Sequence, residues 1–362
     1  MRHLMNHNLT RLIFRAIPVI CISFVILLSG CQPDNTGSSI SVSSSPPGTT
    51  TSITIPSPTV TIDLDKDGID DEIEDRLIKR FAPVVRFHVN EQYLPINVDW
   101  FLPRVRMRFD VNLGFDKQLL DKGQVDSASL ISQETNNQIS GLSAEPTNFF
   151  LEQTDISGGD KLDPYRVGTR IGPGESGWAC YAHVKPVSTG VHYGLYDIQY
   201  IFFYAYNGDL LTGSADSAHE ADVEHITVRI EKDINTVHQI YFAAHNNEGK
   251  WYSPRATDSS PDGYSITGDG RPIVYSALGS HASYPSAGVK DRGILLPADK
   301  TGEGGLEWDC LPNVINLGEK SYPRQGMEWI QYSGRWGEIG AVGYTSGPYG
   351  PAYQDWWNSD PE

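Results

Sequence analysis

The chain has 362 residues, and its 45 Asp and Glu residues outnumber its 28 Lys and Arg residues, which gives a formal net charge of −17. This acidity argues against nucleic acid as a partner, because phosphates are bound by basic surfaces. It also argues against unaided adsorption to anionic lipid. Solubility accounts for most of such an excess, and divalent cations are the natural ligands of the remainder.

The N-terminus has the pattern of a bacterial lipoprotein export signal. A segment with three arginines leads into an apolar run over 16–28, and two small residues, 29–30, precede Cys31. The run is shorter than the about 20 residues that span a bilayer, although a membrane anchor helix is the alternative. The pattern resembles the bacterial lipobox, which implies that residues 1–30 are removed and Cys31 is lipidated. We therefore expect an exported lipoprotein at the outer membrane or cell surface.

The mature part begins with a segment that has no core-forming pattern. Residues 31–61 are rich in Ser, Thr, Pro and Gly and have no apolar period, which predicts an extended, solvated tether. Behind it we expect a calcium loop with a helix over 62–81 and a β-sandwich domain over 82–362. Cys180 and Cys310 are the cysteines left once Cys21 and Cys31 are processed. An oxidising compartment favours their pairing as a disulfide, with two buried free thiols as the alternative.

The folded part is predicted to be all-β. Runs rich in β-branched and aromatic residues alternate with Gly, Pro, Asn and Asp clusters. The predicted strands cover 84–87, 100–109, 195–206, 224–230, 237–243 and 272–277. A helix is predicted over 70–81, because its apolar residues recur at helical spacing and Pro83 follows. Many strands with few helices indicate a β-sandwich or jelly roll.

An aspartate-rich loop precedes this helix and has the spacing of a Ca²⁺ site. The candidate ligands are Asp63, Asp65, Asp67, the backbone carbonyl of Ile69, Asp71 and Glu74. This alternation wraps oxygen atoms around one point, and Gly68 permits the sharp turn. A polar loop rich in helix-capping acids is the alternative. The segment resembles thrombospondin type 3 and similar extracellular calcium repeats, which implies a structural ion that stiffens the junction between tether and domain.

A second group of candidate ligands lies in the segment HEADVEHITVRI at 219–230. Alternate residues of a strand share a face, so Asp222 and Glu224 should lie on the side of the apolar residues that follow. Two carboxylates there are costly unless a cation, an arginine or a shared proton neutralises them. His219 can turn towards the same point. We expect a divalent cation, Ca²⁺ or Mg²⁺, here, with His225, His245 and His281 as supporting residues; a carboxylate pair bonded to arginine is the alternative.

Five longer motifs follow one another along the chain: RFAPVVRFHVNEQYLPINVDWFL, IFFYAYNG, HEADVEHITVRI, VYSALGSHASYPSAG and SGPYGPAYQDWW. Their sequences and their order resemble the vacuolar protein sorting-associated protein 62 family. Ala221 and Val223 depart from the Gly and Trp usual in that family. HEADVEH is also distantly similar to the GHRHDWE heptapeptide of the necrosis-inducing cytolysins, which implies a metal held by His219, Asp222 and Glu224 together with Asp209.

These features together favour a binding module over an enzyme. We expect a surface-anchored lipoprotein whose metal-dependent β-sandwich binds a glycan, a lipid headgroup or a protein at the cell envelope, with the membrane engaged through the N-terminal lipid. A site with open metal positions can also activate water, so a metal-dependent hydrolase of an ester or phosphoester is one alternative. A structural envelope protein is the other.

Overall fold

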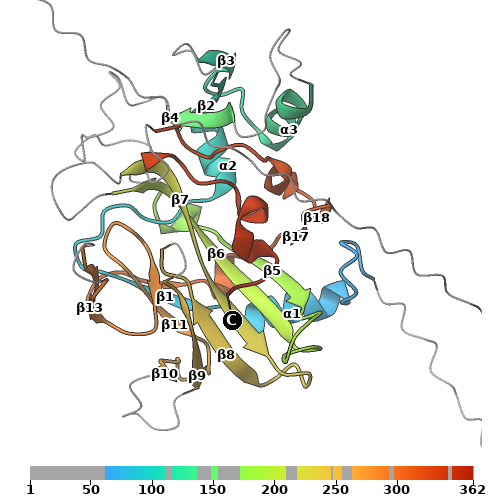
Figure 1. The fold of residues 1–362 in the computed structure, drawn as a ribbon, viewed down its shortest axis with the longest axis vertical. Helices are drawn as coiled ribbons and strands as arrows, with labels where there is room; N and C mark the ends of the chain where they lie inside the picture. Colours follow the sequence, from blue (N-terminus) through green and yellow to red (C-terminus); the bar gives the residue numbers. More distant parts are fainter. Residues whose placement is uncertain are drawn as a thin grey trace, which may run out of the picture. The chain divides into compact units, whose positions relative to one another are not determined.

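The structure is a computed structural model, and its described residues belong to one compact unit within Pro58–Glu362. They are residues 62–110, 116–136, 148–153, 172–208, 218–245, 248–254, 263–292, 297–340 and 345–361. The all-β prediction is confirmed, because strands dominate and the helices are few and short (Figure 1). Within the described ranges, no helix is both long and apolar enough to cross a bilayer.

A seven-stranded sheet with the order β10-β9-β8-β7-β6-β5-β16 forms the centre of this unit. The strands β5 to β9 are antiparallel neighbours, whereas β10 and β16 join the two edges in parallel. The bounds are β5 (Cys180–Pro186), β6 (Tyr196–Asn207), β7 (His219–Ile230), β8 (Val237–Phe242), β9 (Lys250–Pro254), β10 (Gly263–Tyr264) and β16 (Val314–Asn316).

Four smaller sheets surround the central one, with orders β12-β11-β1-β15, β3-β2-β4, β13-β14 and β17-β18. Their strands are β1 (Val84–Phe87), β2 (Val105–Phe109), β3 (Lys117–Leu120), β4 (Phe149–Gln153), β11 (Ile273–Ser276), β12 (Ser283–Tyr284), β13 (Gly288–Lys290), β14 (Asp299–Thr301), β15 (Glu307–Asp309), β17 (Gly318–Glu319) and β18 (Tyr322–Pro323). The helices are α1 (Asp71–Arg80), α2 (Val98–Phe101) and α3 (Ser127–Asn136), and the short 3₁₀ segments are η1 (Leu102–Arg104), η4 (Glu175–Gly177), η5 (Leu311–Asn313), η6 (Glu328–Gln331), η8 (Pro351–Tyr353) and η9 (Asp355–Trp357).

The central sheet is covered by apolar cores on both faces. Tyr200 and Phe202 of β6 pack on one face with residues of α1, β1, β11 and β15. Ile201 and Phe203 point the other way and pack with α2, β2, β4 and η6. Residues 197–206 are therefore all buried, as expected for a strand that lies between two layers.

Helix α1 is stabilised by a side-chain cap at its N-terminus and by the packing of its apolar residues in the core. The Asp70 side chain caps the helix by accepting the backbone N–H groups of Glu72 and Ile73, which are unsatisfied within the helix. Leu77 and Ile78 are buried in the core on the β1 side of the sheet, and Tyr200 Oη donates to Ile78 O at 3.0 Å. The loop and helix therefore pack into the same core as the strands of the domain.

The cysteines are two buried free thiols, so the predicted disulfide is not formed in the structure. Cys310 lies within hydrogen-bonding reach of Cys180, and burial raises the pKa of the Cys310 thiol well above its usual value. Thiol–disulfide exchange proceeds through the thiolate, and a fully buried pair disfavours that form. Of the two alternatives, the structure has the free thiols.

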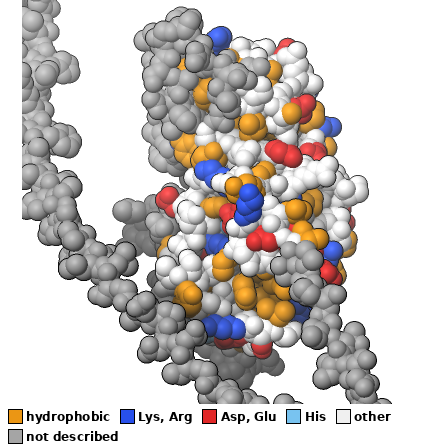
Figure 2. Space-filling model, turned by 90° about the vertical axis from the view of Figure 1, so that its right-hand side faces the viewer, with side chains coloured by type: hydrophobic (Ala, Val, Ile, Leu, Met, Phe, Trp, Pro, Cys, Tyr) orange, Lys and Arg blue, Asp and Glu red, His pale blue; other side chains and the backbone are white. Residues whose placement is uncertain are grey.

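Charged side chains are mixed on the surface. On the face drawn in Figure 2, Asp and Glu side chains lie among Lys, Arg and apolar side chains and do not form one acidic patch. The net charge alone therefore does not mark a cation site, and the clustering of particular carboxylates has to be judged from their geometry.

Candidate metal centres at the N-terminal loop and the sheet edge

The loop before α1 curls its acidic side chains around one region. Asp63 accepts the backbone N–H groups of Lys66 at 2.6 Å and Gly68 at 3.1 Å, and both donors have positive φ. Two groups of carboxylates result, each with ligand atoms within 4.8 Å of one another. They are Asp63, Asp65 and Asp71, and Asp65, Asp67 and Glu74. The structure thus brings together all five acids that the spacing singled out.

Several of these carboxylate oxygens are buried without a partner. They are both oxygens of Asp65, Oδ2 of Asp67 and Oε1 of Glu74, and the side chains of Asp65 and Glu74 are 1% and 0% exposed. Burial raises the pKa of Asp65 to about 6, of Asp67 to about 7 and of Glu74 to about 8. Unpaired buried carboxylates are costly, and hard cations such as Ca²⁺ bind oxygen ligands of this kind.

Two residues from the C-terminal part of the chain, Arg324 and Asn316, bind other carboxylate oxygens of the loop and of α1. Arg324 lies 2.7 Å from Asp71 Oδ2 and 2.6 Å from Glu74 Oε2. Asn316 Nδ2 donates to the same Glu74 oxygen at 3.1 Å. These contacts leave Glu74 Oε1 directed at the other loop acids, and they fix the loop to β16 and the β17–β18 hairpin. The remaining predicted ligand, Ile69, has its side chain in the core, and its N–H donates to Asp67 Oδ1 at 2.7 Å.

Near the start of β7, Asp222 and Glu224 lie on the same face of the central sheet. Asp222 pairs with Tyr204 and Glu224 with Phe202 across the β6–β7 ladder, and both partners belong to the core on the β1 side. Burial, Asp222 and then Asp299 raise the pKa of the half-buried Glu224 well above its usual value. The chain enters this stretch through Ala221, whose φ is +55°.

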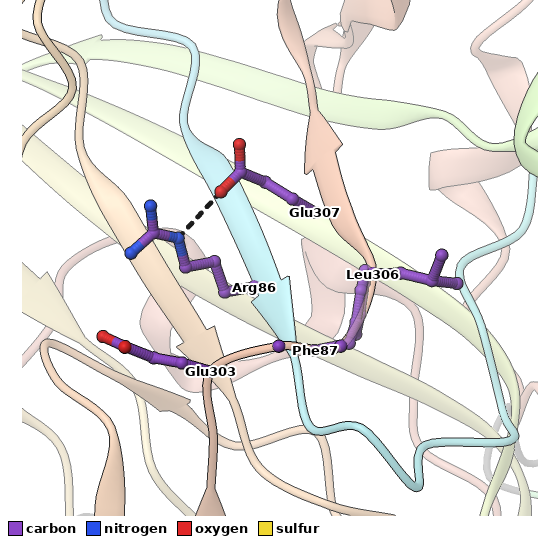
Figure 3. A pocket seen from close by; sticks show the side chains of 7 residues that line it. Arg86, Phe87, Glu303, Leu306 and Glu307 are labelled. Carbon is purple, nitrogen blue, oxygen red and sulfur yellow. Dashed lines mark hydrogen bonds and ion pairs between the residues drawn. The ribbon is translucent and has the colours of Figure 1, made fainter.

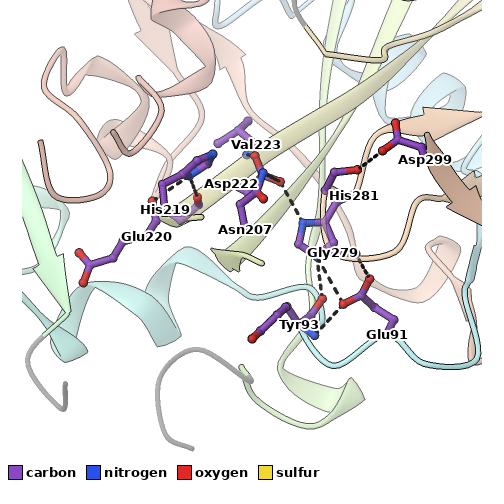
Figure 4. Close-up of polar contacts among 12 residues, drawn as sticks. Glu91, Tyr93, Asn207, His219, Glu220, Asp222, Val223, Gly279, His281 and Asp299 are labelled. Atoms are coloured by element: carbon purple, nitrogen blue, oxygen red, sulfur yellow. Dashed lines mark hydrogen bonds and ion pairs between the residues drawn. The ribbon is translucent and has the colours of Figure 1, made fainter. Parts of the chain in front are cut away.

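His281 is the direct partner of Asp222 (Figure 4). Its Nδ1 lies 2.9 Å from Asp222 Oδ2, and its Nε2 lies 3.1 Å from Tyr93 O and 3.8 Å from Glu91 Oε1. The ring stacks on Tyr204 with 3.8 Å between centroids. Burial acts to lower the pKa of His281, but the hydrogen bond with Asp222 and the nearby negative charge of Glu91 raise it to about 9. An imidazolium therefore balances Asp222 and Glu91.

Among the described residues, neither Arg229 nor Arg271 pairs with these two carboxylates. Arg229 binds Asp197 at 2.8 Å, and Arg271 binds Asp309 and Asp269. Two buried hydroxyls lie near the cluster: Tyr204 Oη and Ser276 Oγ are close to each other, and neither has a hydrogen bond of normal geometry. The site thus has a histidine as its fixed cation and unsatisfied hydroxyls beside its acids.

Four further residues were predicted for this site: Asp209, His219, His225 and His245. Asp209 lies outside the described residues. The Nδ1 of His219 is 2.7 Å from Ala221 O and so faces the backbone (Figure 4). His225 points to the opposite face of β7, where it contacts Asp360 at 2.7 Å, and its supporting role is corrected, because successive strand residues alternate. His245 lies 2.5 Å from Asp299 Oδ2. Among described residues, carboxylates that converge as metal ligands are found in the loop at 63–74.

Sequence reasoning missed the polar groups that complete both sites. Glu91 lies in the quoted motif FHVNEQYLP and accepts N–H groups of Tyr93 at 2.9 Å and Gly279 at 2.7 Å. The signal available for Glu91 was an acidic residue in a motif between two predicted strands. Arg324 and Asn316 had no such signal, because they lie more than 240 residues from the loop they complete.

A pocket of about 340 Å³ lies elsewhere, at the end of β1 (Figure 3). Arg86, Phe87 and the turn 303–307 line it. Its charges are mostly paired, with Arg86 Nε 2.8 Å from Glu307 and Tyr275 Oη donating to Glu303 at 3.2 Å. None of the predicted ligands is among its lining residues, so we assign no function to it.

A family model for vacuolar protein sorting-associated protein 62 matches residues 69–304, which is well over half of the chain. The chain belongs to this family. Vacuolar protein sorting-associated protein 62 of Saccharomyces cerevisiae is 23% identical over 327 residues, covering 76% of this chain and 67% of the yeast protein. The putative vacuolar protein sorting-associated protein TDA6 of the same yeast is 26% identical over 198 residues, covering 44% of this chain and 42% of that protein. The family match begins at Ile69, so Asp63, Asp65 and Asp67 precede it.

Solved structures of necrosis-inducing proteins have a similar coarse architecture. NLPPya in complex with mannosamine is 12% identical with a TM-score of 0.34, covering 80% of this chain and 92% of its own. Necrosis and Ethylene inducing Protein 2 from the causal agent of cocoa's Witches Broom disease is 14% identical with a TM-score of 0.33, covering 75% and 85%. We infer nothing about the sites from similarity at this level.

Proposed function

We propose that this chain is a lipid-anchored, calcium-binding β-sandwich module of the bacterial cell envelope that acts by binding rather than by catalysis. The observation that carries the calcium assignment is the set of buried, unpartnered oxygens on Asp65, Asp67 and Glu74. Ca²⁺ takes six to eight oxygen ligands, and the two carboxylate groups that share Asp65 supply such ligands within 4.8 Å of one another. A metal-dependent hydrolase and a structural envelope protein are the competing functions.

Calcium suits this loop better than a further side chain would. Arg324 already occupies Asp71 Oδ2 and Glu74 Oε2, and one guanidinium charge cannot balance five carboxylates. When bound, the ion would neutralise the loop and fasten α1 to β16 and the β17–β18 hairpin.

Asp65→Asn should weaken Ca²⁺ binding by about a hundredfold, because it removes a charged ligand shared by both carboxylate groups. Isothermal titration calorimetry of the full-length protein with CaCl₂ measures this. Asp75→Asn is the matched control, because Asp75 is an exposed acid on α1, the helix that follows the loop. Equal affinity in the two variants, or no binding in the wild type, would refute the calcium assignment.

At the sheet edge we propose a second divalent cation, Ca²⁺ or Mg²⁺, with a face open to the ligand. Asp222 and Glu224 supply adjacent carboxylates, and the unsatisfied hydroxyls of Tyr204 and Ser276 lie beside them. The half-buried Glu224 gives this cluster its access to solvent. A glycan, a lipid headgroup or a protein carboxylate offers the oxygen atoms that would complete the ion.

Glu224→Gln should remove one bound metal per chain and abolish binding to isolated cell envelopes while the domain stays folded. The substitution conserves shape and removes a ligand charge at a half-buried position. Mass spectrometry for metals and co-sedimentation with envelopes provide the two readouts, and circular dichroism reports the fold. Glu231→Gln is the control, because Glu231 directly follows β7 and its side chain is 41% exposed. Unchanged metal content in Glu224→Gln would end this assignment.

The lipid anchor depends on Cys31, which lies outside the described residues. Cys31→Ser should abolish incorporation of radioactive fatty acid and release the protein from the membrane fraction, because only a thiol accepts the diacylglyceryl group. Labelling of cells that express each form tests this. Equal labelling of the wild type and the variant would remove the lipoprotein assignment and the envelope location with it.

A further inference from the structure

Two neighbouring turns form one end of the central sheet (Figure 1). Residues 187–195 connect β5 with β6, and residues 231–236 connect β7 with β8. Because β6 and β7 are paired, the two turns lie beside each other, and a Cβ atom at Gly194 would lie 2.8 Å from Cε of Lys232. The turns follow the end of β7, whereas the cation site proposed at the sheet edge lies near the start of that strand.

Backbone hydrogen bonds fix both turns. In the first turn, the N–H groups of Val187 and Gly194 donate to the carbonyls of Leu195 and Val187, each at 2.9 Å. In the second, the N–H group of Glu231 donates to the carbonyl of Thr236 at 2.8 Å. Side chains on these turns therefore have defined positions relative to one another, although the turns lie at the surface.

His238 has an irregular position at the start of β8. The register of the β7–β8 ladder shifts after Arg229, and His238 is left without a residue opposite it. A bulge of this kind redirects a side chain. The Nδ1 of His238 donates to Glu231 Oε1 at 2.7 Å, so in the neutral ring Nε2 keeps its lone pair. Among the described residues, no hydrogen bond is made to this Nε2.

His192 approaches His238 from the first turn. The centroids of the two rings are 5.0 Å apart, and their planes are inclined by 65°. A tetrahedral ion bound about 2.0–2.1 Å from one nitrogen of each ring would hold the centroids roughly 5 Å apart. The rings therefore have the separation of two imidazoles that share one ion. The side chain of His238 is 33% exposed and His192 is half-buried, so an ion can reach them from solution.

Imidazole nitrogens select a different class of cation from that bound by the acidic loop. Ca²⁺ and Mg²⁺ prefer oxygen ligands, whereas imidazole suits Zn²⁺, Cu²⁺ and Ni²⁺. A metal-binding histidine usually donates its other ring N–H to a carboxylate, which fixes the ring orientation and raises the basicity of the ligand nitrogen. The contact between Glu231 and His238 has this form.

We propose that His192 and His238 form a binding site for a divalent transition-metal cation such as Zn²⁺, with Glu231 as the residue that orients His238. The two imidazoles leave the remaining positions of the ion to water. When bound, the ion would cross-link the β5–β6 turn to the start of β8. This site goes beyond the proposed function, and it does not depend on either of the oxygen-ligand sites.

Isothermal titration calorimetry of the full-length protein with ZnCl₂, in saturating CaCl₂, tests this site. His192→Gln and His238→Gln should each bind one Zn²⁺ fewer per chain than the wild type. The double variant should also lose only one, because both rings hold the same ion. His88→Gln is the matched control, because His88 is a half-buried histidine directly after β1. It should bind as many ions as the wild type, and circular dichroism reports whether each variant is folded.

A measurement on the wild type makes the test independent of the folding of the variants. In NMR spectra of the histidine rings, ZnCl₂ should shift the signals of His192 and His238, and CaCl₂ should leave them unchanged. Ring signals that do not respond to ZnCl₂, or equal Zn²⁺ stoichiometry in the wild type and both single variants, would overturn the site. Loss of two ions in the double variant would show that the histidines bind separately and would overturn the shared ion.

Discussion

Replacing Arg324 by methionine is expected to lower the free energy of unfolding by about 3–5 kcal/mol in EGTA at pH 8, which is typical when one member of a buried ion pair is removed. Glu74 is 0% exposed, and its Oε2 receives Arg324 at 2.6 Å and Asn316 at 3.1 Å. Methionine keeps most of the apolar stem but removes the charge, so Glu74 and Asp71 lose their counter-ion. Urea unfolding followed by circular dichroism measures the change.

Calcium should partly rescue this variant. A bound ion supplies the missing positive charge, and a ligand at a hundred times its Kd stabilises the native state by about 2.7 kcal/mol. Arg86→Met is the control, because Arg86 pairs with the exposed Glu307 and surface pairs contribute about 0–1 kcal/mol. Equal losses in the two variants would show that Arg324 does not hold a buried cluster. A larger loss in calcium than in EGTA would contradict the proposed site.

Replacing Glu220 by glutamine is expected to raise the free energy of unfolding above that of the wild type at pH 8, with a smaller difference between the two proteins at pH 5. Glu220 is 7% exposed, and its Oε2 accepts the backbone N–H groups of Gln153 and Glu338, each at 3.2 Å. Burial raises the pKa of Glu220 to about 8 from 4.5. Above pH 4.5 the carboxyl ionises in the unfolded chain but stays protonated in the folded one, so the wild type loses stability as the pH rises towards 8.

The size of this effect follows from proton linkage. One proton changes stability by about 1.4 kcal/mol per pH unit, so the wild type should lose about 3–4 kcal/mol between pH 5 and pH 8 from this group. Glu220→Gln keeps the acceptor and lacks the titration, so its loss should be smaller by that amount. Urea unfolding at pH 5, 6.5 and 8 measures it, with the exposed Glu175→Gln as control. Parallel pH profiles for the two variants would show that Glu220 is ionised in the folded protein.

Local signals predicted the elements whose determinants lie close together in the chain. The predicted strand over 84–87 coincides with β1, and the predicted helix over 70–81 differs from α1 only at its capping residues. The strand predicted over 100–109 is wrong in its first half. Residues 98–104 form α2 and η1 there, with Pro103 in the first 3₁₀ turn, and only 105–109 form β2. Proline favours the start of such a turn, and this outweighed the aromatic residues nearby.

The shortest strands of the C-terminal part were missed for a physical reason. The segment over 299–323 contains β14 to β18 as strands of two or three residues. Such short runs have no readable period, and β16 forms only because it pairs in parallel with β5 from another part of the chain.

The same distinction applies to the candidate sites. The five loop acids lie within twelve residues, so their spacing alone predicted that they converge. The Asp222–His281 pair joins residues 59 positions apart, and the sequence indicated only that each was polar beside a buried strand. The role of His281 as the cation that balances Asp222 required the fold. So did the contacts of Arg324, which determine which loop oxygens remain free.

An anomalous difference map from crystals of the full-length protein grown in CaCl₂ tests the central claim most directly. The calcium site predicts a peak between the carboxylates of Asp65, Asp67 and Glu74, with Arg324 remaining on Glu74 Oε2. The same map from Asp65→Asn crystals should lack that peak. A wild-type map without density at this position, despite ordered loop residues and calcium in the crystals, would contradict the site.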